Sequence, residues 1–301
     1  MSTPRSLRLP RQVRPIAIQT SRGAFAALTA ESAVGVSERQ PALLVPGYTG
    51  SKEDFLPVLE SLTAAGRAVT AIDMRGQFES PAADSAAGYQ LDELASDLLA
   101  ITAAISANAS GAGGIHLLGH SFGGLIARHA VLAEPAAYLS LTLLGSGPGT
   151  IGGARAQILR DLLDFLQPAD GDTAALRERI ILLWDAQAAP QARADGTPPD
   201  IIEFLRDRTL RSCPIGLTEM ARHLLDLPDR TAELAAGQLP ILVSYGENDD
   251  AWPPDVQDLM AKRLGAERVC IPGAAHSPAV EAPETTAAML TSFWNQTEPP
   301  W

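Results

Sequence analysis

The stretch Ile115-His-Leu-Leu-Gly-His-Ser-Phe-Gly-Gly-Leu-Ile-Ala127 decides the fold of this chain. Residues 115–118 form a short apolar run typical of a buried strand, and residues 125–134 have the pattern of a helix. Between them lies Gly119-His-Ser-Phe-Gly123, a G-x-S-x-G sequence. Glycine two residues away on either side of Ser121 lets a strand and a helix approach closely at a sharp turn. Such a turn exposes the Ser121 hydroxyl at a helix N-terminus, where backbone N–H groups favour negative charge.

Short apolar runs alternate with helical patterns on both sides of this turn. The expected strands are 42–45, 68–72, 115–118, 139–144, 241–245 and 268–271, preceded by an antiparallel pair within 16–29. The expected helices of this part are 51–66, 91–106, 125–134, 256–264 and 283–294. Strands that alternate with helices favour crossover connections. The sequence therefore predicts an α/β fold with a mainly parallel, doubly wound sheet.

The alternation stops between residues 149 and 230, where only helical patterns occur. These are 154–166, 174–186, 199–210 and 217–227, separated by Gly, Pro and Asp. Apolar residues such as Ile158, Leu162, Phe165 and Leu166 share a helical face. We therefore expect a first core part at 1–148, a helical cap at 149–230 and a second core part at 231–301. The cap is expected to pack over the sheet edge that carries Ser121 and to select the substrate, with a rigid appendage or a dimer surface as the alternative.

A nucleophilic serine needs a base, and the base needs a carboxylate that orients it. Among five histidines, only His276 follows the last expected strand, in a loop that can fold over the sheet edge. His120 is expected to point away from the serine beside it. The turn after the preceding strand offers three acidic residues, of which the step after Gly246 favours Asp249 over the competitors, Glu247 and Asp250.

An oxyanion that develops on a substrate needs N–H donors. Pro46-Gly47-Tyr48 ends an early strand on the same sheet edge, so the Tyr48 N–H can point at an oxyanion together with the Phe122 N–H. Pro-Gly is also a common turn dipeptide, and this segment alone is weak evidence.

Together these motifs resemble the α/β-hydrolase superfamily over about residues 40 to 295. The matching pieces are Pro46-Gly-Tyr48, Asp73-Met-Arg-Gly-Gln-Phe-Glu-Ser80, Gly119-His-Ser-Phe-Gly123, Gly246-Glu-Asn-Asp249 and Gly273-Ala-Ala-His-Ser277. In this sequence Phe78 stands where the family often has glycine, and Pro46 where it often has histidine. The resemblance implies that the helical stretch after the sixth strand is the family's cap. Serine at position 121 disfavours epoxide hydrolases, haloalkane dehalogenases and dienelactone hydrolases, which carry Asp or Cys there.

Composition excludes several other classes. The 301 residues carry a formal net charge of −12. Only 2 of the 23 basic residues are lysines, an arginine excess that indicates the codon usage of a GC-rich bacterium. Without clustered Lys and Arg we expect no nucleic-acid partner. The sequence contains no run of 18 apolar residues, so we expect no membrane span. The first 19 residues lack the apolar stretch of a signal peptide. Two lone cysteines, Cys213 and Cys270, favour free thiols over a disulfide, and a cytoplasmic location.

The sequence therefore predicts a cofactor-free serine hydrolase, without a bound metal, that cleaves a carboxylic ester or lactone with a small or medium apolar acyl group. Ser121, His276 and Asp249 form the expected catalytic triad, and the reaction passes through an acyl-enzyme. A thioesterase, a C–C bond hydrolase or a perhydrolase can use the same triad. A ligand receptor or a lyase that retains the triad is the alternative from another class. The sequence predicts neither the natural substrate nor an oligomeric state.

Overall fold

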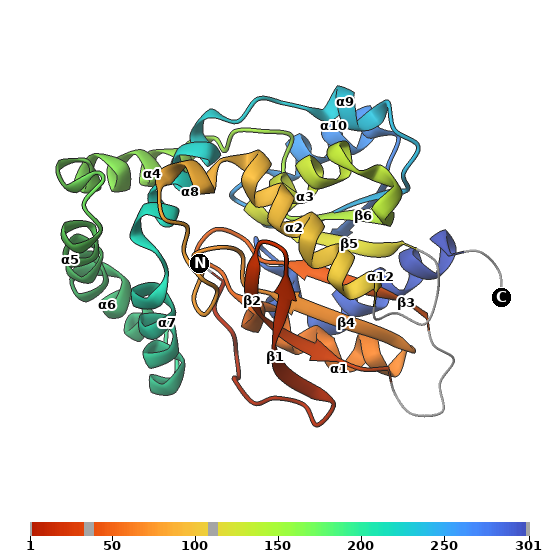
Figure 1. Cartoon of the computed structure of the whole chain (residues 1–301), viewed down its shortest axis with the longest axis horizontal. Helices are drawn as coiled ribbons and strands as arrows, with labels where there is room; N and C mark the ends of the chain where they lie inside the picture. The colour runs from red at the N-terminus through yellow and green to blue at the C-terminus, as the bar shows by residue number, and fades with distance from the viewer. Residues whose placement is uncertain (1, 33–38, 108–113, 299–301) are drawn as a thin grey trace.

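An eight-stranded sheet forms the centre of the molecule (Figure 1). The computed structural model describes residues 2–32, 39–107 and 114–298. The strand order is β1-β2-β4-β3-β5-β6-β7-β8. The strands are β1 (Val13–Thr20), β2 (Gly23–Ala30), β3 (Arg39–Val45), β4 (Arg67–Ile72), β5 (Ile115–His120), β6 (Tyr138–Leu144), β7 (Ile241–Gly246) and β8 (Glu267–Ile271). β1 and β2 form an antiparallel hairpin that pairs antiparallel with β4, and the other neighbours are parallel. The predicted α/β fold with a mainly parallel sheet is confirmed.

Helices cover both faces of this sheet. One face packs against α1 (Leu56–Ala64) and α12 (Pro283–Thr297), and the other packs against α2 (Leu91–Ser106), α3 (Phe122–Ala133) and α10 (Pro254–Leu264). Side chains alternate between the two faces along β3: Ala42 and Leu44 join one core cluster, and Leu43 and Val45 join the other. This is why the central strands read as unbroken apolar runs rather than as alternating polar and apolar residues.

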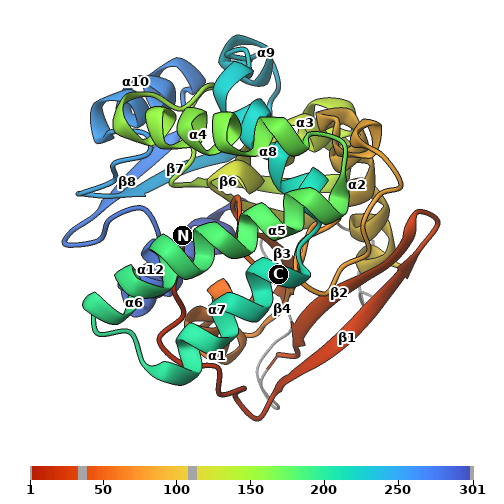
Figure 2. The same cartoon turned by 90° about the vertical axis from the view of Figure 1, so that its left-hand side faces the viewer.

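Between β6 and β7 the described chain forms helices and no strand (Figure 2). They are α4 (Gly153–Leu166), α5 (Thr173–Leu183), a π-helical turn (Trp184–Ala188), α6 (Ala189–Ala194), α7 (Pro199–Arg211), α8 (Pro214–Asp226) and α9 (Thr231–Ala235). We call α4 to α8 the helical insert. The sequence missed α6, α9 and the four-residue α11 (Pro278–Glu281), because elements of four to six residues are too short to show a helical period.

The two ends of the helical insert lie side by side. The Thr150 N–H donates to the Leu227 carbonyl at 3.1 Å, and the Ile151 N–H donates to the Leu224 carbonyl at 2.8 Å. A Cβ on Gly149 would lie 2.8 Å from the Leu227 oxygen, whereas one on Gly152 would meet nothing within 4 Å. Gly149 is therefore packed in place, and only the glycines after it have room to change conformation.

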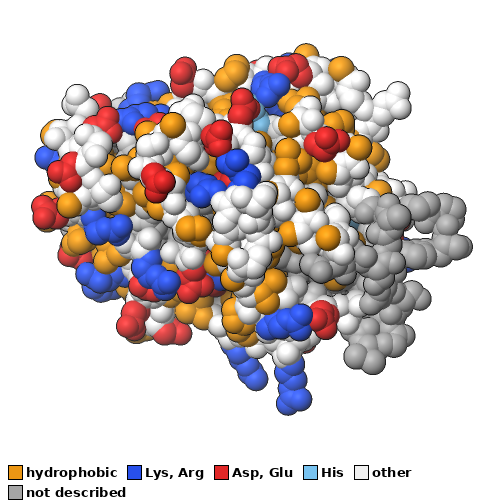
Figure 3. Space-filling model, in the orientation of Figure 1, with side chains coloured by type: hydrophobic (Ala, Val, Ile, Leu, Met, Phe, Trp, Pro, Cys, Tyr) orange, Lys and Arg blue, Asp and Glu red, His pale blue; other side chains and the backbone are white. Residues whose placement is uncertain are grey.

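The insert packs its apolar residues unevenly. Leu166 is buried, together with Leu176, Ile180 and Leu217 from α5 and α8. Ile158, expected on the same packed face, is 61% exposed. On the face drawn in Figure 3, acidic and basic side chains are interspersed over the insert rather than gathered by sign.

The segment before β1 runs between the insert and the core. The Ser2 carbonyl accepts a hydrogen bond from Arg208 of α7 at 2.8 Å. The Ser2 hydroxyl lies 2.7 Å from the hydroxyl of Ser277, next to His276. Leu7 packs against a small apolar cluster formed by α6, α7 and Trp184. These contacts tie the insert to the core, and no sequence pattern in residues 2–9 predicts them.

Two simpler expectations concern the chain as a whole. Both cysteines are free: Cys213 is buried and Cys270 is exposed. None of the helices in the described ranges is long and apolar enough to cross a membrane.

Candidate active site

Ser121 lies at the turn between β5 and α3 in a strained backbone conformation. Its φ is 55° and its ψ is −122°, a region that residues with a side chain rarely adopt. A Cβ on Gly119 would overlap the Gly123 carbonyl, and a Cβ on Gly123 would overlap the Pro46 carbonyl. The two motif glycines therefore allow close backbone packing around the serine, as the sequence predicts. The strain persists because the surrounding backbone holds the turn on both sides.

Two loops far apart in the sequence bring His276 and Asp249 to this serine. The His276 Nε2 atom lies 2.9 Å from the Ser121 Oγ atom. Its Nδ1 atom lies 3.0 Å from the Asp249 Oδ1 atom. The Asp249 side chain is fully buried, and that of His276 is 16% exposed. The three side chains form one hydrogen-bonded chain that begins at a protected carboxylate and ends at a serine hydroxyl.

The other two acidic residues of the β7 turn have different partners. The Asp250 carboxylate forms a two-pronged contact with the Arg155 guanidinium of α4, at 3.0 and 2.8 Å. That guanidinium lowers the pKa of Asp250. Glu247 accepts a hydrogen bond from the Gly273 N–H at 3.0 Å. Of the three candidates, the described structure brings Asp249 to His276.

The Asp249 carboxylate has two further donors. The Ala251 N–H donates to Oδ1 at 2.9 Å, and the Gln257 amide of α10 donates to Oδ2 at 3.0 Å. The same Gln257 nitrogen donates to the Trp252 carbonyl, and Gln257 is completely buried. Donors on both oxygens fix the orientation of the carboxylate. The sequence contains no signal for Gln257, because its role depends on how α10 packs against the β7 turn.

His120 has a partner that the sequence does not predict. Its Nε2 atom lies 2.7 Å from the main-chain carbonyl of His276, so Nε2 is the protonated nitrogen and donates there. The two imidazole rings are 5.1 Å apart. Burial, with a smaller contribution from the nearby His276, lowers the pKa of His120 to about 3. His120 therefore stays neutral near pH 7 and anchors the loop that carries His276.

Two backbone N–H groups close to Ser121 have no acceptor within the described ranges. Phe122 is the first residue of α3, so its N–H has no partner within the helix. Gly47 approaches so closely that a Cβ there would lie 2.9 Å from the Ser121 Cβ, which places the Gly47–Tyr48 peptide beside the serine. In the described ranges the Tyr48 N–H donates no hydrogen bond to another residue. The Tyr48 ring is half-buried and packs against apolar residues of both the core and the insert.

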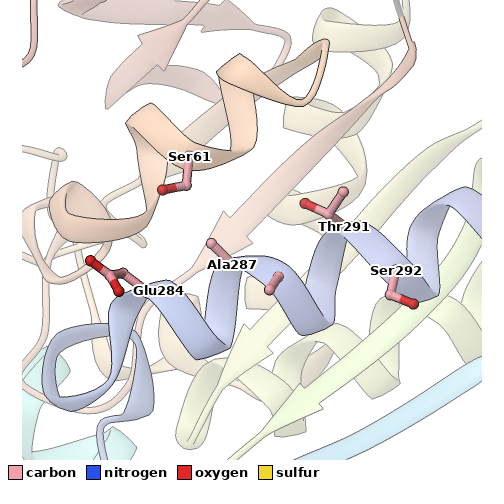
Figure 4. Close-up of a pocket in the computed structure, with 6 residues that line it drawn as sticks. Ser61, Glu284, Ala287, Thr291 and Ser292 are labelled. Carbon is pink, nitrogen blue, oxygen red and sulfur yellow. The ribbon is translucent and has the colours of Figure 1, made fainter.

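A surface hollow lies between α1 and α12, away from this site (Figure 4). It is lined by Ser61, Glu284, Ala287, Ala288, Thr291 and Ser292. None of the site residues contributes to it. Among the residues that the structure describes, no group of three His, Cys, Asp or Glu side chains is placed to hold a metal ion.

Known proteins share both the sequence pattern and the architecture. The alpha/beta hydrolase family matches residues 42–289. The chain belongs to the α/β hydrolase family. Rhodomycin D methylesterase DnrP of Streptomyces peucetius is 29% identical over 275 residues, which cover 80% of this chain and 89% of that protein. The pimeloyl-[acyl-carrier protein] methyl ester esterase of Photobacterium profundum is 30% identical over 185 residues, covering 58% of this chain and 68% of that protein.

A solved esterase has the same fold. The structure of a thermophilic esterase from Thermogutta terrifontis superposes with a TM-score of 0.70 and 22% identity, and covers 95% of this chain and all of that one. Family membership and these esterase relatives identify the chain as an enzyme, a hydrolase. The prediction of an α/β-fold hydrolase is confirmed.

Proposed function

We propose that this hydrolase is a serine carboxylesterase in which Ser121, His276 and Asp249 act as the catalytic triad. The observation that carries the proposal is the continuous hydrogen-bonded chain of these three side chains, 2.9 and 3.0 Å long at its two links, at a strained strand-to-helix turn. The methylesterase relatives support esters of a small alcohol as the substrate class.

The reaction follows from the position of each group. His276 Nε2 takes the proton of the Ser121 hydroxyl while Oγ attacks the ester carbonyl. The negative charge that develops on the carbonyl oxygen is stabilised by the Tyr48 and Phe122 N–H groups. His276 then gives the proton to the departing alcohol, which leaves an acyl group on Ser121. A water molecule, deprotonated by His276, then attacks the acyl carbonyl, and His276 returns the proton to the Ser121 Oγ atom as the carboxylic acid leaves. Asp249 holds the imidazole with its proton on Nδ1 throughout.

A fluorophosphonate probe tests the nucleophile, since it reacts with an activated serine. Labelling is expected on Ser121 in the natural protein, and Ser121→Ala is expected to lose labelling and about 10⁵- to 10⁶-fold in kcat towards p-nitrophenyl esters. A panel of methyl esters, lactones and thioesters then ranks the substrate classes. Labelling that persists in Ser121→Ala, or a thioester preferred over every ester, contradicts the proposal.

We also propose that residues 149–230 form a cap domain between the two core parts, 1–148 and 231–301, and that this cap selects the acyl group. Tyr48 supports this, because its side chain packs against both the core and the insert cluster, and its N–H belongs to the proposed oxyanion hole. Leu162 and Phe165 of α4 are half-buried beside that cluster, whereas Ile158 on the same helix is exposed. The two free cysteines support a cytoplasmic location.

The three α4 residues provide a matched test of the cap. Leu162→Ala and Phe165→Ala are expected to shift the preference among esters of increasing chain length by about 10-fold or more, because one methylene group in an apolar pocket is worth about 1–3 kcal/mol. Ile158→Ala, the control, is expected to leave it unchanged. An unaltered preference in folded Leu162→Ala and Phe165→Ala protein contradicts a selective cap.

A further inference from the structure

Gln77 lies in the turn after β4, and its side chain makes two hydrogen bonds within the described ranges, neither of them to a triad residue. It is 1% exposed. Its side-chain nitrogen donates to the Gly47 carbonyl at 2.8 Å, and its side-chain oxygen accepts from the Met74 N–H at 3.1 Å. With a donor on one end and an acceptor on the other, the amide has only one orientation that satisfies both neighbours.

The turn itself is held firmly. The Gln77 N–H donates to the Met74 carbonyl at 2.9 Å, and the Ser80 hydroxyl donates to the Asp73 carbonyl at 2.7 Å. Phe78 has a φ of 36°, a conformation suited to the glycine that the family often has there. Its N–H donates to the Ser212 hydroxyl at 3.1 Å, and its ring packs edge-on against Phe204 of α7. Contacts with the insert therefore hold Phe78 in its strained conformation. Because Phe78 follows Gln77 directly, these contacts also fix the position of the Gln77 side-chain amide.

The Gly47–Tyr48 peptide couples Gln77 to the site. A trans peptide unit is planar, and its C=O and N–H point in opposite directions. The described chain contains no cis peptide bond. On one side of this peptide, the Gly47 oxygen accepts from Gln77 and from the Gly50 N–H, the latter at 3.1 Å. The Tyr48 N–H must then point to the opposite side, and it has no other acceptor in the described ranges.

We propose that Gln77 is a positioning residue for the oxyanion hole: by holding the Gly47 carbonyl, it aims the Tyr48 N–H at the oxygen that becomes negative during attack by Ser121. This inference rests on the proposed function. The site needs such a residue because an N–H donor stabilises an oxyanion only when it is already oriented before charge develops. Without Gln77, the Gly50 N–H is the one donor to that carbonyl among the described residues, so we expect the peptide to rotate more freely.

Gln77→Leu removes the amide and keeps a similar volume. We expect kcat/KM for a p-nitrophenyl ester to fall by about 10- to 100-fold, less than or equal to the loss from deleting an oxyanion donor outright. Two inhibitors separate positioning from general damage. An alkyl trifluoromethyl ketone forms a hemiketal with Ser121 and places an oxyanion in the hole, so its Ki should rise by the same factor. The corresponding ether has no carbonyl, and its Ki should stay within about twofold because ground-state binding does not use the hole.

Gln77→Glu and Gln12→Leu complete the experiment. Glutamate has the same length and still accepts from Met74, but when ionised it presents an oxygen to the Gly47 carbonyl, so we expect the trifluoromethyl ketone to bind weakly at pH 8. Gln12 donates to the Thr63 hydroxyl away from the site, and its leucine variant should behave as the natural protein. If Gln77→Leu does not fold, Gln77→Glu tests the inference in its place.

Natural affinity for the trifluoromethyl ketone in a folded Gln77 variant overturns the inference. So does an equal loss for the ketone and the ether, because that indicates a loosened site rather than a misdirected N–H. The proposed function fails in a different way: the natural protein would then neither hydrolyse the ester nor bind the ketone.

Discussion

The glycines of the sheet-edge turns and those at the helix ends of the insert have opposite surroundings. A Cβ on Gly119 or Gly123 would overlap a backbone carbonyl of a neighbouring segment. In the insert, Gly152 and Gly171 would accept a Cβ with no atom within 4 Å, although Gly171 needs its positive φ of 81°. Gly119 and Gly123 make room for close backbone packing, and Gly152 and Gly171 serve only chain conformation. Gly216 of α8 is the exception in the insert, because a Cβ there would lie 2.6 Å from the Tyr89 ring.

Polar side chains also differ between the sheet edge and the insert. At the sheet edge Ser121, Asp249 and Gln257 are buried. The Gln257 amide donates to Asp249, and the Ser121 hydroxyl is hydrogen-bonded to His276. The insert's ion pair between Arg155 and Asp250 is largely exposed. The proposed catalytic side chains therefore lie in a region in which backbone and side chains hold one another in place.

Two adjacent aspartates give the largest expected difference. Asp249→Asn leaves His276 with the wrong tautomer and is expected to lower kcat by about 10⁴-fold. Asp250→Asn breaks only the exposed contact with Arg155 and is expected to change kcat by less than about threefold. Steady-state kinetics of both variants measures this. Similar losses at the two positions, or a larger one at Asp250, would contradict Asp249 as the carboxylate that orients His276.

Arg208 is the exception in the insert and sharpens the comparison. It is buried and pairs with Asp54 of the core at 2.8 Å, so Arg208→Leu is expected to lower the free energy of unfolding by about 3–5 kcal/mol. Arg155→Leu, the exposed counterpart, should cost about 1 kcal/mol or less. Urea unfolding of both variants compares them.

The pH dependence of the Arg208 effect has a defined sign. Burial raises the pKa of Asp54 to about 6 even with Arg208 beside it, and removing Arg208 raises it further. The folded variant then holds a proton that the unfolded chain has released, so its stability falls as pH rises from 5 to about 8. A loss that is larger at pH 5 than at pH 8 contradicts a buried pair.

A pair of glycines tests the packing contrast directly. Gly119→Ala places a methyl group against the Gly123 carbonyl and is expected to cost about 3 kcal/mol. Gly152→Ala meets nothing and is expected to change the free energy of unfolding by less than about 1 kcal/mol. Thermal or urea unfolding of the two variants provides the measurement. Equal stabilities would remove the distinction between the two kinds of glycine.

The smallest expected effect concerns acid stability at the sheet edge. With a pKa lowered to about 3, His120 stays neutral in the folded protein, while in the unfolded chain it binds a proton below its usual pKa of about 6.5. Stability from this residue is therefore present above that pH and is lost on acidification. In the natural protein the free energy of unfolding falls as the pH is lowered from 6 to 4. His120→Gln should reduce the slope of this fall by up to about 1.4 kcal/mol per pH unit. Parallel stability curves would show that His120 does not remain neutral.

Local patterns predicted the fold well because buried parallel strands and their crossover helices each leave a signal within a few residues. The apolar run at 115–118, the glycines around Ser121 and the helix after it all belong to one continuous segment. Boundaries shifted by a few residues: the strand expected at 115–118 extends to His120, and α3 begins at Phe122 rather than at Leu125. Helix ends depend on capping and on contacts with neighbours, which periodicity does not encode.

The sequence by itself also determined which residue types lie at the sheet edge, since the residues that follow the ends of parallel strands lie at one edge of the sheet. It proposed Ser121, His276 and Asp249, but it left Glu247 and Asp250 as competitors, because all three acidic residues share one short turn. Only the tertiary structure decided which carboxylate reaches His276, since that depends on a segment 27 residues away folding over the same edge. The supporting residues Gln77, Gln257 and His120 were decided there too, because each acts through a hydrogen bond to a backbone or side chain distant in sequence. Strand and helix patterns record local periodicity, and such long-range hydrogen bonds leave no trace in it.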